Sequence, residues 1–122
     1  MSNPSKQRGT RWETEVVGYL RRHGFPHAER RTLSGSQDRG DVNAAPGLVI
    51  ECKNQARHSW AEWLDEALAE AQNVGPGTVG IVWAHRRGKA GAGDGYVVTD
   101  GATFARLLRM AGYGNPLEEE DA

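Results

Sequence analysis

The chain has very little cysteine and no long apolar run. Its single cysteine, Cys52, excludes an internal disulfide, and the apolar residues before it favour a small buried side chain. No stretch approaches the length of a membrane span, and the polar start over residues 1–11 lacks the apolar core of a signal peptide. We therefore expect a soluble protein in a reducing cytoplasm, the host's if the chain is phage-encoded, with no membrane contact.

A second domain and internal repeats are also lacking. The 122 residues suit one domain with a modest hydrophobic core. We place that domain over residues 1–116 and expect the acidic tail, residues 117–122, to be disordered. The glycine-rich stretch 85–95 lacks the Gly-Lys-Ser/Thr ending of a nucleotide phosphate-binding loop, so it predicts a hairpin tip or a DNA clamp instead.

Basic residues are clustered, although the net charge of the chain is only −1. Without the four negative charges of residues 118–121, the net charge would be +3. Such clusters suit contacts with DNA phosphates, and solvated surface is the alternative. The basic residues that we expect to contact DNA are Lys6, Arg8, Arg11, Arg30, Arg31, Arg39, Arg86, Arg87 and Lys89.

The segment from Asp41 to Lys53 is the most informative part of the chain. Residues 48–53 favour a strand, in which alternate side chains share a face, so Glu51 and Lys53 project together while Ile50 and Cys52 point into the core. Residues 41–44 can form a partner strand, and the turn at 45–47 contains proline and glycine. This hairpin brings Asp41 back toward Glu51.

Two neighbouring carboxylates repel each other unless a cation lies between them. Mg²⁺ prefers oxygen ligands and keeps several waters for a phosphate substrate, so Asp41 and Glu51 form a candidate metal site. Lys53 adds a charge that can hold the attacking water or stabilise the transition state. The pattern favours hydrolysis of a phosphodiester, and a solvated salt bridge at a strand end is the alternative.

The first predicted helix, residues 10–23, carries a further candidate. Its apolar arc includes Trp12, Val16, Val17 and Leu20, and Glu13 falls inside the arc. A core-facing carboxylate is costly unless a cation compensates it. Glu13 is therefore a candidate functional residue, although a partly exposed glutamate on a helix flank would show the same pattern.

The remaining elements complete the order α-β-β-β-α-β-β-α. A strand at 27–32 leads into a polar loop whose Ser34 and Ser36 are candidates for phosphate contact, although the loop can equally be a connector. The second helix starts with a capping box at Ser59 and ends near residues 75–76. Strands follow at 78–84 and 96–99, and Asp100 caps a last helix. The expected apolar face of the second helix is Trp60, Leu64, Ala67, Leu68 and Ala71.

The element order and the residues Asp41, Glu51 and Lys53 resemble the PD-(D/E)xK nuclease superfamily, with Gly40 where the proline would stand. The resemblance implies an α/β, restriction-endonuclease-like core (α-β-β-β-α-β) with a mixed central sheet flanked by helices. Gly9 and Glu13, followed by a serine-glycine-serine loop, are similar to the archaeal-type Holliday-junction resolvases and their phage relatives.

This resemblance implies a homodimer that cuts four-way DNA junctions symmetrically with Mg²⁺, which Mn²⁺ can replace, as in DNA recombination and repair. The alternatives are a restriction-like or nicking endonuclease on duplex or flap DNA, an inactive DNA-binding protein with the same fold, and a structural domain with a coincidental motif. The implied catalytic residues are Glu13, Ser34, Asp41, Glu51 and Lys53. The expected metal ligands are Glu13, directly or through water, Asp41, Glu51 and the carbonyl of Cys52.

Overall fold

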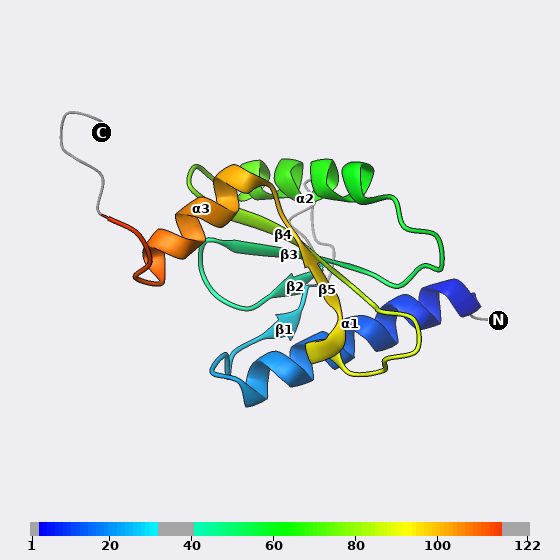
Figure 1. Cartoon of the computed structure of the whole chain (residues 1–122). Helices are drawn as coiled ribbons and strands as arrows, with labels where there is room; N and C mark the ends of the chain where they lie inside the picture. Colours follow the sequence, from blue (N-terminus) through cyan, green and yellow to red (C-terminus); the bar gives the residue numbers. More distant parts are fainter. Residues whose placement is uncertain (1–2, 32–40, 116–122) are drawn as a thin grey trace.

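The computed structural model describes residues 3–31 and 41–115, and the expected acidic tail lies outside these ranges. The described elements follow the predicted order (Figure 1). No helix among them has both the length and the apolar character needed to cross a bilayer. The elements are α1 (Pro4–Arg22), β1 (Glu29–Arg30), β2 (Val42–Asn43), β3 (Leu48–Lys53), α2 (Trp60–Val74), β4 (Val79–Ala84), the 3₁₀ helix η1 (Ala92–Asp94), β5 (Tyr96–Val98) and α3 (Gly101–Met110).

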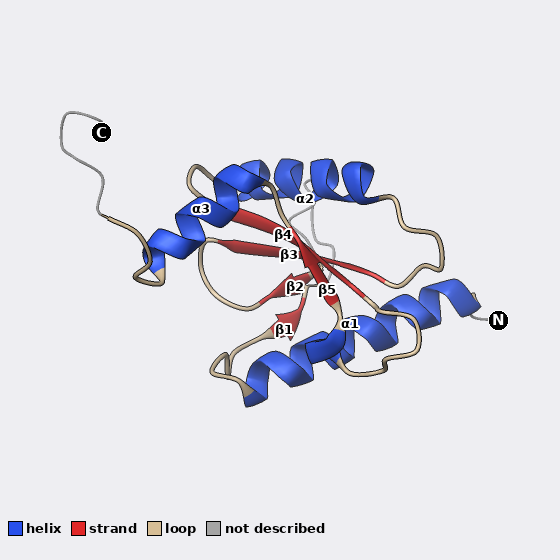
Figure 2. Cartoon of the chain, viewed as in Figure 1, coloured by secondary structure: helices blue, strands red, loops and turns tan. Residues whose placement is uncertain are grey.

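The five strands form one mixed sheet in the order β1-β2-β3-β4-β5. Strands β3 and β4 run parallel, whereas the other neighbouring pairs are antiparallel. Helix α2 makes the crossover between the two parallel strands, as such a connection requires. Figures 1 and 2 show α1 on one side of the sheet and α2 on the other. The α/β class with a mixed sheet flanked by helices is thus confirmed.

Strand β3 lies at the centre of this sheet, and both of its faces are covered. Ile50 and Cys52 belong to the core beneath α1. The residues that α1 contributes to this core include Trp12, Val16 and Leu20. The alternation along β3 turns Glu51 toward α2, where its carboxylate is also buried, with 4% of the residue exposed. The predicted division of β3 into two faces is correct, but the face that carries Glu51 is not open to water.

Helix α1 begins six residues earlier than the predicted start at Thr10, at Pro4. The side chain of Asn3 caps it by accepting a hydrogen bond from the backbone N–H of Ser5 at 2.9 Å. Pro4 follows at the first helical position, where its fixed φ and missing N–H cost nothing. The basic residues of the N-terminal segment, Lys6, Arg8 and Arg11, therefore lie on a helix.

Helix α2 begins and ends where predicted, and Ala67 and Ala71 are buried as predicted. Trp63 and Glu70 are also buried, whereas Trp60, Leu64 and Leu68 are only half-buried. The helix lies close to β4, since a Cβ at Gly80 would be 2.7 Å from the Ala67 carbonyl oxygen. The Ser59 side chain makes no capping hydrogen bond, so the expected capping box does not form.

We expect Gly80→Ala to lower the free energy of unfolding by about 1–3 kcal/mol, because the added methyl group meets the Ala67 backbone and forces α2 away from the sheet. Gly101→Ala is the matched control, since a Cβ there meets nothing within 4 Å. It should change stability by less than about 1 kcal/mol. Urea denaturation measures both, and equal stability of the two variants would contradict this packing.

Candidate metal centre

The candidate site lies at the end of the molecule where β3 and β4 finish. Because these two strands are parallel, their carboxyl ends share one edge of the sheet, and the N-terminal parts of α1 and α2 lie at the same end (Figure 1). A cleft of about 500 Å³ opens there. The residues that line it include Arg8, Gly9, Asp41, Glu51, Cys52 and Lys53.

Asp41 reaches the site through the predicted hairpin. The register pairs Val42 with Ile50, and the N–H of the preceding residue, Asp41, donates to the Ile50 carbonyl at 3.0 Å. Its Oδ2 accepts a hydrogen bond from the backbone N–H of Cys52 at 2.9 Å. A strand residue directs its N–H and C=O to the same side, so the Cys52 carbonyl also faces Asp41. The structure therefore brings Asp41 and Cys52, two of the predicted ligands, together.

The thiol of Cys52 is not a good metal ligand in this setting. Burial, reinforced by the negative charges of Asp41, Glu13 and Glu51, raises its pKa far above the usual range. The thiol thus stays protonated, whereas the reactive and metal-binding form is the thiolate. Cys52 can contribute to an oxygen-rich site only through its backbone carbonyl, as predicted.

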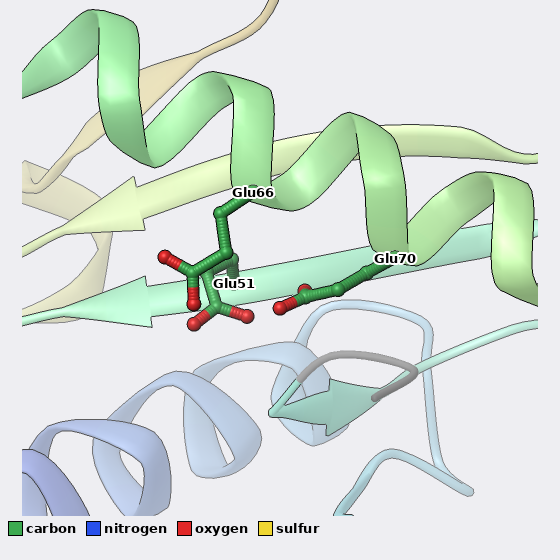
Figure 3. A group of neighbouring side chains, drawn as sticks. All are labelled: Glu51, Glu66 and Glu70. Atoms are coloured by element: carbon green, nitrogen blue, oxygen red, sulfur yellow. The ribbon is translucent and has the colours of Figure 1, made fainter. Parts of the chain in front are cut away.

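Glu51 is the most deeply buried carboxylate of the cleft. Desolvation raises its pKa first, the contact with Glu70 raises it further, and the negative charges of Asp41 and Glu66 add to the effect. Figure 3 shows Glu66 and Glu70 projecting from α2 toward Glu51 on β3. One ligand oxygen from each of Glu51, Glu66 and Glu70 lies within 4.8 Å of the others. Glu66 and Glu70 were not predicted.

Lys53 is the cation nearest to this acidic group. Its Nζ lies 3.4 Å from Glu51 Oε1 and 3.0 Å from Glu66 Oε2. Burial alone would lower the pKa of Lys53, but the hydrogen bond with Glu66 and the attraction of both carboxylates outweigh it, so the pKa is raised. The amine therefore stays charged and can stabilise negative charge, but it is a poor proton acceptor.

Glu13 lies on the α1 side of the same region and is paired with Arg30, whose Nε is 3.1 Å from Glu13 Oε1. Desolvation and the charge of Asp41 raise the Glu13 pKa, while Arg30 opposes the shift. Among the described residues, the carboxylates whose ligand oxygens lie within 4.8 Å of one another do not include Glu13 or Asp41. Of the predicted ligands, Asp41 is the one whose negative charge raises the pKa of both Glu13 and Glu51.

Six of the predicted DNA-contacting residues fall in two exposed groups near this end of the molecule, while Arg30 lies on β1 and is paired with Glu13. Three lie on α1 and three on the loop after β4, while Arg31 is half-buried after β1 and its backbone N–H donates to the Asp41 carbonyl. Ser34, Ser36 and Arg39 lie outside the described residues. The exposed residues are Lys6, Arg8 and Arg11 on α1 and Arg86, Arg87 and Lys89 on the loop.

Comparison of the chain with models of protein families, with curated proteins and with solved structures finds no match. The chemistry of the site therefore has to be judged from its own atoms. Mg²⁺, Ca²⁺ and Mn²⁺ prefer oxygen donors, and the cleft offers carboxylates, a backbone carbonyl and room for water. Thiolate and imidazole ligands, which softer metals prefer, are absent from the residues that line the cleft. The donor set fits a hard divalent cation.

We expect the metal-free protein to lose stability as the pH rises from 5 to 8. The folded state keeps a proton on Glu51 that the unfolded chain has lost above its ordinary pKa of about 4.5, so the folded state binds more protons and rising pH favours unfolding. Glutamine is neutral in both the folded and the unfolded state, so Glu51→Gln removes the cost of taking up this proton. It should stabilise the metal-free protein at pH 8 by about 1 kcal/mol or more and flatten the pH dependence.

Urea unfolding in EDTA at pH 5 and pH 8 measures the effect. Asp65→Asn is the matched control, because it removes one negative charge at an exposed position of α2. Its pH dependence should remain that of the wild-type protein. The account of Glu51 would be wrong if the Glu51→Gln variant and the wild-type protein lost stability in parallel as the pH rises.

Proposed function

We propose that the protein is a Mg²⁺-dependent endodeoxyribonuclease with a restriction-endonuclease-like core, and that it resolves four-way DNA junctions by symmetric phosphodiester hydrolysis. The observation that carries the proposal is the cleft at the end of β3, where Asp41, Glu51 and Lys53 meet beside Arg8. The cleft combines oxygen donors for a hard cation, a charged amine and a guanidinium group. Hydrolysis of a phosphodiester needs these groups together.

Asp41, Glu51 and the Cys52 carbonyl are the residues that would hold Mg²⁺ or Mn²⁺, with Glu13 a further ligand directly or through water. When bound, the metal lowers the pKa of a coordinated water and offsets charge on the phosphate. Lys53 stays protonated between Glu51 and Glu66, so its role is to stabilise negative charge that develops on the phosphate oxygens. Glu66 acts through Lys53 by fixing the position of its amine.

The two exposed basic groups on α1 and on the loop after β4 would hold the DNA backbone on either side of the cleft. Contacts of this kind position a duplex without reading its sequence. The preference for a four-way junction rests on the resemblance to the resolvases. In that case a two-fold homodimer would present two cleavage sites, and their spacing would select a branched substrate.

We expect the protein with Mg²⁺ to make paired symmetric cuts in a labelled four-way junction and to leave a linear duplex and a single strand of the same sequence intact. Asp41→Asn and Lys53→Ala should each lower the cleavage rate at least about 100-fold, because the first removes a proposed metal ligand and the second removes the positive charge that stabilises the transition state. EDTA should abolish cleavage, and Mn²⁺ should restore it.

Asp65→Asn is again the matched control and should cut at the wild-type rate, since Asp65 is exposed on α2. Equal cutting of all three DNAs would replace the resolvase with a general endonuclease that uses the same residues. Junction binding without cutting under any metal would indicate an inactive DNA-binding protein. Cleavage that survives Asp41→Asn would place the reaction elsewhere in the molecule.

A further inference from the structure

Aromatic side chains gather around the start of α2. Ring centroids of His58 and Trp60 lie 4.6 Å apart, those of Trp60 and Trp63 lie 5.2 Å apart, and those of Trp60 and Tyr96 lie 5.7 Å apart. His58 is also 5.8 Å from Tyr96. The residues come from the loop before α2, the first turn of α2 and the start of β5, so the fold assembles this aromatic cluster from segments that are distant in sequence.

The aromatic cluster is buried at one end and accessible at the other. Trp63 is buried in the smaller core between α2 and the sheet. Trp60 is half-buried, His58 is exposed, and Tyr96 is 38% exposed. The chain has only 7% aromatic residues, so the concentration of accessible rings at one place calls for a physical role.

Positive charge accompanies the accessible rings. The Arg86 guanidinium lies 5.6 Å from the Tyr96 ring centroid, within the range of a cation–π contact. The other basic residues of the same loop, Arg87 and Lys89, are exposed, and so is Arg57, which precedes His58. Stacking rings beside exposed cations are the combination that binds single-stranded nucleic acid.

The aromatic cluster is continuous with the cleft. Asn54, Gln55 and Ala56 line the cleft, and the chain passes from them directly to His58 and Trp60. Lys53 lies between the two regions: it lines the cleft, and its Nζ is 6.0 Å from the Trp63 ring centroid. Trp63 in turn contacts Trp60, so a DNA strand with a phosphate beside Lys53 would bring neighbouring bases close to the aromatic cluster.

We propose that the aromatic cluster stacks against unpaired bases of the DNA strand whose phosphate occupies the cleft, with Arg86 contacting the backbone. The proposal rests on the proposed nuclease function and names its substrate more closely: DNA with unpaired or unstacked nucleotides at the branch point. Bases inside a continuous duplex stack on each other, so their faces are not available to the rings. If the cluster served only to cover the smaller core, it would stabilise the protein and have no preference for bases.

The test measures binding in EDTA, without cleavage, to two labelled single strands. One is an oligothymidylate of about 12 nucleotides, and the other is an abasic strand of the same length, which has the same charge but no bases. The wild-type protein should bind the oligothymidylate at least about fivefold more tightly, because stacking of a single base contributes that much or more. Its tryptophan fluorescence should be quenched by the oligothymidylate and not by the abasic strand.

Tyr96→Leu and Trp60→Leu keep apolar volume but remove the ring. Each variant should therefore bind the oligothymidylate and the abasic strand with similar affinity. Arg86→Gln should weaken binding of both strands to a similar extent. The matched control is Tyr113→Leu, which removes a ring that is 67% exposed beyond α3. It should keep the wild-type preference for bases.

Equal affinities of the wild-type protein for the two strands would overturn the proposal, as would an unchanged preference in both leucine variants. If the leucine variants do not fold, the quenching in the wild-type protein decides the question. The assay also separates this proposal from the proposed function. Metal-dependent cleavage without a preference for bases overturns the stacking alone, whereas a preference for bases without cleavage overturns the nuclease.

Discussion

The buried carboxylate of Glu51 is the constraint on which the candidate site depends. It lies on the central strand, in the same cleft as Asp41, under a helix that adds Glu66 and Glu70. A carboxylate in such a position is costly, and Lys53, shared with Glu66, compensates only part of the negative charge. The fold therefore concentrates acidic groups where a divalent cation would stabilise them. The raised pKa of Glu51 has the same origin, namely burial and the neighbouring negative charges.

The sheet topology explains why this charge gathers at one end of the molecule. The parallel pair β3 and β4 ends at the edge where the first turns of α2 and the basic half of α1 also lie. The exposed cations lie on α1 and on the loop after β4, and the aromatic cluster lies around the start of α2 and the start of β5. In α/β sheets, ligands commonly bind beyond the carboxyl ends of the strands. The proposed metal ligands, the charged amine of Lys53 and the proposed DNA-contacting surface would thus act on one phosphate and its neighbouring bases.

Local patterns predicted the β2–β3 hairpin and the approach of Asp41 to Glu51, because alternation along a strand and turn chemistry act over a few residues. The early start of α1 had a signal in the sequence, the Asn3-Pro4 pair, which the apolar periodicity outweighed. Glu66 and Glu70 had none, because their approach to Glu51 depends on how α2 is rotated on the sheet. The close approach of Gly80 to Ala67 is likewise a contact between α2 and β4 that forms only in the folded chain.

The central claim is that these carboxylates hold a divalent cation, and a calorimetric titration of the wild-type protein with Mn²⁺ or Mg²⁺ tests it most directly. The account predicts saturable binding that is lost in Asp41→Asn and in Glu51→Gln and retained in Asp65→Asn, because only the first two variants remove a cleft ligand. The absence of saturable heat in the wild-type protein, or binding that is equal in all four proteins, would contradict it.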